Sequence, residues 1–405
     1  MDVKLESLMM DLYYQKNRMQ MQNYIFDSCY DITAIDERIY ELLSNGDISY
    51  PFLLRTFVDS SPDCSCLLNR IDNYENYKKN ISDEVEKGSI KYKVKIARAM
   101  KEDVIALMKA RDMVAKALDY KSYPDLILSS DGLTIDELKK VLNKHLDKHL
   151  VDVKRLIKQH QLEWSTWFRD LDNICDKKEN YSSNEYVQKV LTKFDLNLRS
   201  KIKLEISSEL FASFVIATSK NDINVFIRES STLGEVLALF HELGHAIHYS
   251  MIEGDGLKNI LPSSLSEIMA VVIEYIATQI LLEGDERRQL NEIMLIDYTR
   301  CAISSLFELD LYEKIGDAEN LYVKHYTKLG LEVNNPSVWS YDSFRSIDPV
   351  YIHNYVLGYT IAKNMYEKLK DTYGDDYGKW GAWLVENIYK HGSNLHVQDI
   401  MNLSL

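Results

Sequence analysis

Hydrophobic residues recur at helical spacing through most of the first 200 residues of the chain. Between residues 91 and 118, Ile96, Met100, Val104 and Leu107 follow one another at steps of three or four residues, which places them on one face of a helix. The same periodicity predicts further helices over 4–22, 34–45 and 135–176. The first half of the chain is therefore predicted to be a succession of helices.

Two pairs of residues have the pattern of a capping box, in which a Ser or Thr at the N-cap and a Glu three residues later satisfy each other's backbone amides. Thr134 and Glu137 stand before the helix predicted from residue 135. Thr232 and Glu235 stand before an apolar helical segment that continues past residue 245. Both pairs predict where a helix begins.

The pattern changes after residue 200, where short β-branched runs show partial alternation of apolar and polar side chains. These runs cover residues 201–207, 211–219 and 223–228, and they are typical of strands in a small sheet. After residue 232 the pattern is helical again, with breaks near Pro262, Pro336 and Pro349. The predicted fold is mainly α with a small β-sheet beside the helix that begins near residue 233.

Composition supports this fold class and suggests two lobes. The 405 residues include only 15 Gly and 6 Pro, too few turn formers for a sandwich, barrel or propeller of that length. A chain this long is expected to form two or three domains or one domain with lobes. Because the segment 176–186 is polar and lacks helical periodicity, we predict an N-terminal helical lobe over 1–180 and a catalytic lobe over 181–405.

Charge and cysteine content limit the partners and the compartment. The net charge of −14 argues against binding of a nucleic-acid backbone, which requires a basic surface. The sequence lacks an obvious stretch of 18 apolar residues and a signal-peptide pattern in its first 30 residues, so we expect no membrane association. The five cysteines are irregularly spaced and suggest neither a disulfide framework nor a zinc site. We expect a cytoplasmic protein.

One segment of the helix predicted from residue 233 carries the pattern HExxH, formed by His241, Glu242 and His245. Two histidines four residues apart on a helix lie on one face, where both imidazoles can bind a single Zn²⁺. The side chain of Glu242 points to one side of that face, where its carboxylate can contact a water molecule rather than the metal. The alternative is a pair of surface histidines. It is disfavoured because the flanking residues are apolar nearly all round the helix, and unpaired buried histidines are costly.

A catalytic zinc site needs a third protein ligand. His248 follows on the same face, but three ligands within two turns of one straight helix cannot converge on one ion, so we expect His248 beside the site. Glu267 is the better candidate, because it lies in an otherwise apolar helix where a carboxylate needs a partner. The alternative is that Ser264 and Glu267 form a capping box. Glu274 lies seven residues later on the same face and could orient a metal-binding imidazole.

These motifs resemble the thimet oligopeptidase/oligoendopeptidase F family of zinc metallopeptidases. The resemblance rests on LFHELGHAIH at 239–248 and LSEIMAVVIE at 265–274, and it extends to INVFIRESSTLGEVLALF, DPVYIHNYVLGYTIA and the C-terminal IYKHGSNLHVQDIMNLSL. It is strong over residues 200–405 and faint over 90–130. It implies a two-lobed helical zincin-type metallopeptidase, with a deep substrate channel, one Zn²⁺ on its floor and a strand that pairs with the peptide.

The resemblance also implies catalytic roles for Tyr351 and Tyr355, whose hydroxyls would stabilise the oxyanion. The alternative is that they belong to an aromatic core stripe, in a chain with 27 tyrosines. Two departures from the family stand out. The chain is shorter than typical members, which predicts a reduced N-terminal lobe. The family histidine before the tyrosine cluster is replaced by Arg345 or Ser346, and His353 occupies a position where many relatives have another tyrosine.

The sequence as a whole predicts a cytoplasmic zinc-dependent endopeptidase that hydrolyses short unfolded peptides. Zn²⁺ would be bound by His241, His245 and Glu267, with Glu242 as the base that takes a proton from the attacking water. Three alternatives share these residues: a zinc carboxypeptidase, a dedicated processing peptidase for one leader peptide, and a peptide-binding protein without activity. Sequence features leave the oligomeric state open.

Overall fold

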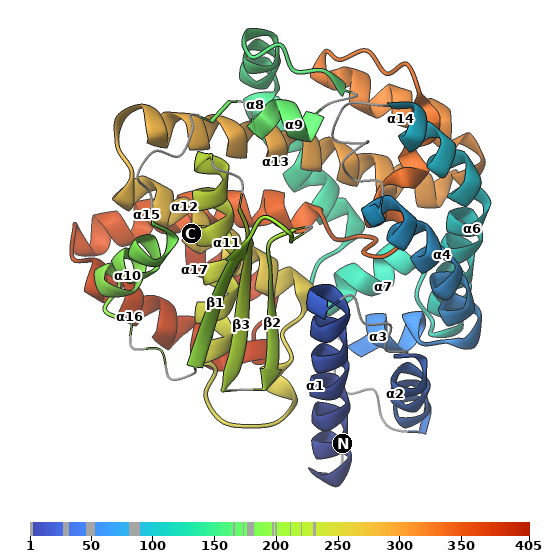
Figure 1. Ribbon diagram of the computed structural model, residues 1–405, viewed down its shortest axis with the longest axis horizontal. Helices are drawn as coiled ribbons and strands as arrows, with labels where there is room; N and C mark the ends of the chain where they lie inside the picture. Colours follow the sequence, from blue (N-terminus) through green and yellow to red (C-terminus); the bar gives the residue numbers. More distant parts are fainter. Residues whose placement is uncertain are drawn as a thin grey trace. The chain divides into compact units, whose positions relative to one another are not determined.

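The computed structural model describes the whole chain except residues 1–2, 27–31, 46–52, 81–89, 165–166, 173, 176–181, 197, 199–200, 211, 220 and 230–231 (Figure 1). The described residues form helices and one three-stranded sheet. This confirms the predicted fold class, mainly α with a small β-sheet.

The chain packs into two compact units, each assembled from segments that are distant in the sequence. The first unit comprises Met1–Ser49, Cys175–Asn291 and Leu357–Leu405, and the second comprises Tyr50–Ile174 and Glu292–Val356. The predicted boundary between lobes 1–180 and 181–405 lies within residues 176–181, outside the described residues. That division stays a prediction.

The elements that lie wholly within the first unit are nine helices and three strands among the described residues. They are α1 (Val3–Phe26), α2 (Thr33–Asn45), α10 (Ser183–Lys193), β1 (Lys201–Ser207), β2 (Phe214–Ser219), β3 (Asp222–Arg228), α11 (Leu233–Met251), η2 (Leu257–Asn259), α12 (Ser263–Leu281), α16 (Tyr377–Asn387), η7 (Tyr389–Asn394) and α17 (Val397–Ser404), to which most of α15 (His353–Tyr373) is added.

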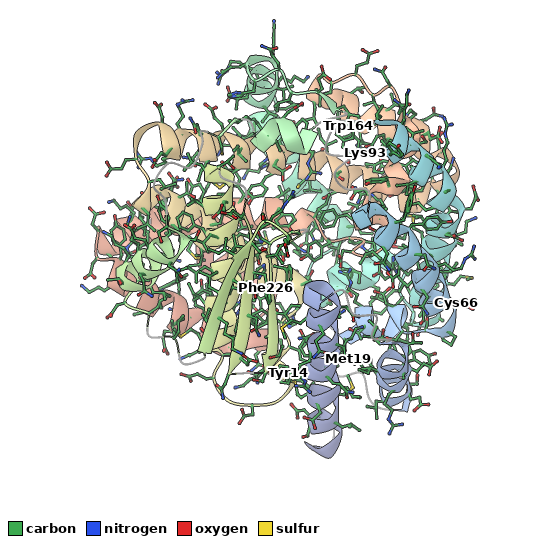
Figure 2. All side chains as sticks on the ribbon, in the orientation of Figure 1. Tyr14, Met19, Cys66, Lys93, Trp164 and Phe226 are labelled. Carbon is green, nitrogen blue, oxygen red and sulfur yellow. The ribbon has the colours of Figure 1, made fainter. Side chains whose placement is uncertain are left out.

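The sheet has the order β1-β3-β2, with β1 parallel and β2 antiparallel to the central strand β3. The side chain of Phe226 on β3 stacks on Phe214 of β2 with ring centroids 4.8 Å apart (Figure 2). The second strand begins at Phe214 rather than at the predicted residue 211. A physical reason is that the backbone N–H of Arg228, at the end of β3, donates to Ser213 Oγ at 3.0 Å. This N–H is therefore bonded to a side chain at the end of the sheet.

Helix α1 joins the first unit because it packs along β2 (Figure 1). Asn17 donates from its amide to the carbonyl of Ala217 at 2.8 Å, and Arg18 donates to the carbonyl of Thr218 at 3.2 Å. These bonds satisfy two carbonyls near the end of an edge strand. The first helix of the chain is therefore fixed to a strand 200 residues away in sequence.

The second unit is helical in its described residues. Its elements are α3 (Leu53–Asp59), α4 (Pro62–Asn80), α6 (Ile90–Ala117), α7 (Tyr123–Ser130), α8 (Ile135–Gln159), α9 (Trp167–Asp172), η3 (Ile315–Asp317), α14 (Ala318–Tyr326), η4 (Thr327–Leu329), η5 (Pro336–Tyr341) and η6 (Ser343–Arg345), together with most of α13 (Gly284–Glu313).

The start of α8 was predicted correctly and its end was not. Thr134 and Glu137 form the predicted capping box at its N-terminus. The helix ends at Gln159 instead of continuing to residue 176, because the chain turns at Gln161, which adopts a left-handed φ of 53°. That conformation is incompatible with a continuing α-helix.

Helices α11 and α12 pack against each other in the core of the first unit. They come close together at Gly244, where an added Cβ would lie 2.7 Å from the Cα of Ala270. Among the described residues, α12 is the one helix apolar and long enough to span a membrane, with a mean hydropathy of 1.4, yet 78% of that window is buried in the structure. A helix buried to this extent packs in the protein core.

Candidate metal centre

Helix α11 begins at Leu233, as predicted, but the predicted capping box is wrong. Thr232 is the N-cap residue and makes no side-chain capping bond. The carboxylate of Glu235 instead accepts the hydroxyl of Ser183 at 3.0 Å. The helix is held by burial of apolar residues nearly all round its axis, including Val236, Leu239 and Phe240, rather than by its cap.

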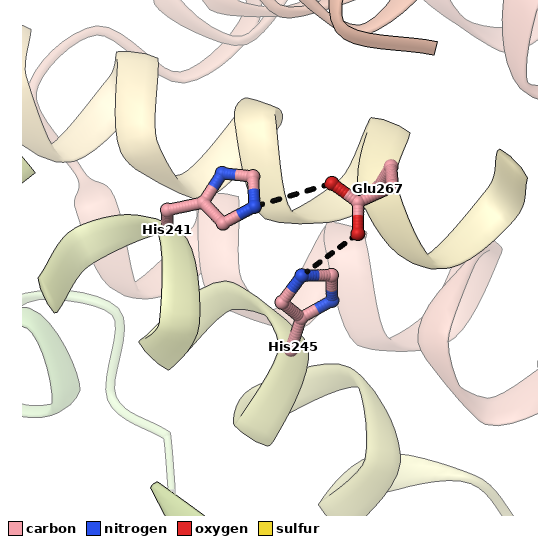
Figure 3. A group of neighbouring side chains, drawn as sticks. All are labelled: His241, His245 and Glu267. Carbon is pink, nitrogen blue, oxygen red and sulfur yellow. Dashed lines mark ion pairs between the residues drawn. The ribbon is translucent and has the colours of Figure 1, made fainter. Parts of the chain in front are cut away.

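The three side chains predicted as metal ligands lie together (Figure 3). Glu267 Oε2 is 3.3 Å from His241 Nε2, and Glu267 Oε1 is 3.2 Å from His245 Nε2. One donor atom from each residue lies within 4.8 Å of the others. Two imidazole nitrogens and a carboxylate oxygen at this separation are a donor set suited to a divalent cation such as Zn²⁺.

The alternative role of Glu267 as a helix cap is not what the structure shows. Helix α12 begins at Ser263 after the N-cap residue Pro262, and no side chain caps it. Glu267 is therefore inside the helix, where its carboxylate faces the two histidines.

The other nitrogen of each imidazole is held by a second residue of α12. His241 Nδ1 lies 2.8 Å from Glu274 Oε2, and His245 Nδ1 lies 2.8 Å from Ser266 Oγ. Such partners fix the ring orientation and leave the ε nitrogens free to bind a cation. Glu274 occupies the place that the sequence predicted. Sequence reasoning missed Ser266, for which the only signal was its position next to Glu267.

The charged groups at this centre shift one another's pKa values. Burial raises the pKa of Glu267, but the charges of His245 and His241 and their hydrogen bonds outweigh it, and its pKa lies well below its ordinary value. Burial lowers the pKa of His241, but its hydrogen bonds to Glu267 and Glu274 raise it well above its ordinary value. The carboxylates thus stabilise positive charge at this point, whether carried by a proton or by a metal ion.

Glu242 and His248 lie on the same helix and differ in environment. Burial raises the pKa of the Glu242 carboxyl despite the opposing charges of His245 and His241, a shift suited to a general base. His248 is fully buried, neither of its ring nitrogens has a hydrogen-bond partner among the described residues, and its ring lies 5.1 Å from that of Tyr389. Its ring is therefore not part of the cluster formed by His241, His245 and Glu267.

Tyr351 and Tyr355 belong to the second unit, where their rings meet edge to face at 6.1 Å. Tyr351 also stacks on Phe344 at 5.7 Å, and Tyr355 on Tyr298 at 6.1 Å. Helix α15 begins at His353, so Tyr351 precedes the helix. Both tyrosines are partly exposed, and their catalytic roles stay predictions.

Three residues near the position where the family has a histidine, which this chain lacks, are all buried. Arg345 is 1% exposed and forms an ion pair with Glu308 at 3.1 Å. Ser346 and His353 are 0% and 2% exposed. The side chains of these three residues are thus enclosed by protein atoms in this structure, and a role for any of them in place of that histidine stays a prediction.

Similarity to known proteins is found in structure and not in sequence. No protein-family model and no curated protein sequence matches the chain. An M32 carboxypeptidase from Deinococcus radiodurans matches with a TM-score of 0.64 and 11% identity, over 99% of this chain and 94% of that chain. Metallocarboxypeptidase 1 of Trypanosoma cruzi matches with a TM-score of 0.59 and 13% identity, over 99% of this chain and 95% of that chain.

A putative oligoendopeptidase F matches with a TM-score of 0.59 and 12% identity, over 100% of this chain and 78% of that chain. The chain therefore has the helical fold of this group of proteins. Because both carboxypeptidases and oligoendopeptidase F proteins share that fold, membership of the family indicated by the motifs stays a prediction.

Proposed function

We propose that the protein is a zinc-dependent peptidase that hydrolyses short unfolded peptides. The observation that carries this proposal is the convergence of His241, His245 and Glu267, with Glu242 adjacent to His241 on the same helix. One bound Zn²⁺ would polarise the scissile carbonyl and lower the pKa of a water molecule. The comparisons support the proposal through the fold alone.

The chain's own residues supply the remaining chemistry. Glu242 takes a proton from the attacking water and delivers it to the leaving amine. Its buried position, which raises its pKa, favours uptake of the proton from the water. The hydroxyls of Tyr351 and Tyr355 are proposed to donate hydrogen bonds to the oxyanion. Peptides are the proposed partners, without nucleic acid or membrane, and the cytoplasm is the proposed compartment.

Cleavage within the peptide is the activity proposed first, and carboxypeptidase activity is the second candidate. The second candidate is favoured by the extent of the structural matches. They span 94% and 95% of two carboxypeptidase chains and 78% of an oligoendopeptidase F chain. The chain thus matches nearly the whole length of these two carboxypeptidases and a smaller share of the oligoendopeptidase F chain.

The experiment that tests the proposal is cleavage of a mixed peptide library, followed by mass spectrometry. The metal-free protein and the protein reconstituted with one equivalent of Zn²⁺ are compared, with Glu242→Gln as the control. Zinc-dependent cleavage at internal bonds supports the endopeptidase, and stepwise loss of C-terminal residues supports the carboxypeptidase. Cleavage of a single sequence would indicate a dedicated processing peptidase. Binding of peptides without any cleavage by the zinc-loaded protein contradicts the proposal.

A further inference from the structure

The two histidines of the candidate metal centre are held by partners of different charge. His241 is held by the carboxylate of Glu274, whereas His245 is held by the neutral hydroxyl of Ser266. Ser266 is 5% exposed and directly precedes Glu267. Consecutive residues of α12 therefore contact the two nitrogens of one imidazole, with Ser266 Oγ at 2.8 Å from Nδ1 and Glu267 Oε1 at 3.2 Å from Nε2.

We infer that Ser266 is a positioning residue that holds His245 in the tautomer needed to bind the metal. The inference rests on the proposed zinc centre. With Nε2 directed at the cation, the ring proton resides on Nδ1 and is donated to Ser266 Oγ, which lies 2.8 Å away. Without this serine the ring of His245 loses its partner on Nδ1 and can rotate or exchange tautomers.

The neutral partner also suits the charge at this centre. Glu242, Glu267 and Glu274 are all within or beside the cluster and are all buried, so three carboxylates already surround the position of a divalent cation. A fourth carboxylate on His245 would add negative charge and reduce the polarising power of the cation. The hydroxyl of Ser266 orients the ring without that cost.

The test measures the affinity for Zn²⁺ by competition with a chromogenic chelator, in protein first freed of metal. Ser266→Ala is expected to weaken Zn²⁺ binding by about 10–100-fold, the range for loss of a partner of a metal-binding histidine. Ser266→Thr keeps the hydroxyl and should restore affinity close to that of the wild type. Ser264→Ala, a buried serine of the same helix, is the matched control.

Thermal melts of the metal-free variants separate positioning from folding. The inference predicts that Ser266→Ala melts close to the wild type without metal and differs from it with Zn²⁺. Wild-type affinity in Ser266→Ala would overturn the inference, as would an equal loss in Ser264→Ala or a loss in Ser266→Thr as large as in Ser266→Ala. If Glu267→Ala loses Zn²⁺ while Ser266→Ala retains it, the metal centre stands and the positioning role fails. If Zn²⁺ binds as predicted and no peptide is cleaved, the positioning role stands and the proposed function fails.

Discussion

The side chain of Glu274 lies 2.8 Å from Nδ1 of His241, while Glu267, seven residues earlier on the same helix, faces the other nitrogen of that ring. One helix therefore presents both a candidate ligand and the residue that orients another ligand. This arrangement makes the contributions of the two glutamates separable by mutation.

Glu267→Ala is predicted to abolish stoichiometric Zn²⁺ binding, because it removes a donor atom from the centre. Glu274→Ala is predicted to weaken binding by about 10–100-fold, because His241 loses only the partner that orients it. Metal analysis of the purified variants and chelator competition measure both effects. Glu283→Ala, at an exposed position just beyond α12, should bind Zn²⁺ as the wild type does. Equal zinc content in wild type and Glu267→Ala would refute the ligand assignment.

Gly244→Ala is predicted to destabilise the protein by about 1–3 kcal/mol, the usual cost of overpacking a core. The added Cβ would lie 2.7 Å from the backbone Cα of Ala270, and backbone cannot move aside as a flexible side chain can. Chemical denaturation measures the loss. Gly316→Ala is the control, since a Cβ there meets no atom within 4 Å. An unchanged free energy of unfolding in Gly244→Ala would show that α11 and α12 do not approach so closely.

Acid is predicted to destabilise the protein through two buried histidines. Burial, together with the charge of His245, lowers the pKa of His248 to about 3, and burial, together with the charge of Arg55, lowers the pKa of His353 to about 3. Below pH 6.5 the unfolded chain takes up protons that the folded chain does not. The free energy of unfolding therefore falls by about 1.4 kcal/mol per pH unit for each histidine, down to about pH 3.

The measurement is denaturant unfolding of the metal-free protein between pH 7 and pH 4.5, so that loss of metal makes no contribution. His353→Gln and His248→Gln should each reduce the slope of stability against pH by about 1.4 kcal/mol per unit. A slope identical to that of the wild type in both variants would mean that neither histidine stays neutral in the folded protein.

Tyr351→Phe or Tyr355→Phe is predicted to lower kcat by about 10²–10³-fold, the range for loss of an oxyanion donor. KM should change little, because the bond forms mainly in the transition state. Steady-state kinetics on one cleaved peptide provide the values. Tyr359→Phe is the control, since that ring is buried against Tyr275 at 5.7 Å. Wild-type kcat in both single variants and in the double variant would assign the two tyrosines to packing alone.

The sequence predicted the helical fold and the cluster of candidate ligands because both depend on local periodicity. The spacing of His241 and His245 fixes their relative position on a helix whatever the rest of the chain does. Glu267 and Glu274 could be predicted since carboxylates in an otherwise apolar helix need partners. The strands β1 and β3 were predicted to the residue or nearly so because β-branched alternation is also local.

Other features depended on contacts between distant segments, which no local pattern encodes. Glu235 was expected to cap its own helix, but Ser183, 52 residues earlier, supplies its partner. The bond between Ser266 and His245 requires the close approach of α11 and α12, which Gly244 permits. The ion pair of Arg345 with Glu308 likewise joins two segments of the chain and has no local signal in the sequence.

The measurement that tests the central claim most directly is the paired analysis of zinc content and peptide hydrolysis in Glu242→Gln. Gln keeps the size of the side chain and removes its basicity, while His241, His245 and Glu267 remain in place to bind the metal. The account predicts that this variant binds one equivalent of Zn²⁺ as tightly as the wild type and cleaves no peptide. A variant that retains more than a few per cent of the wild-type rate, or that is purified without zinc when the wild type contains it, would contradict the account.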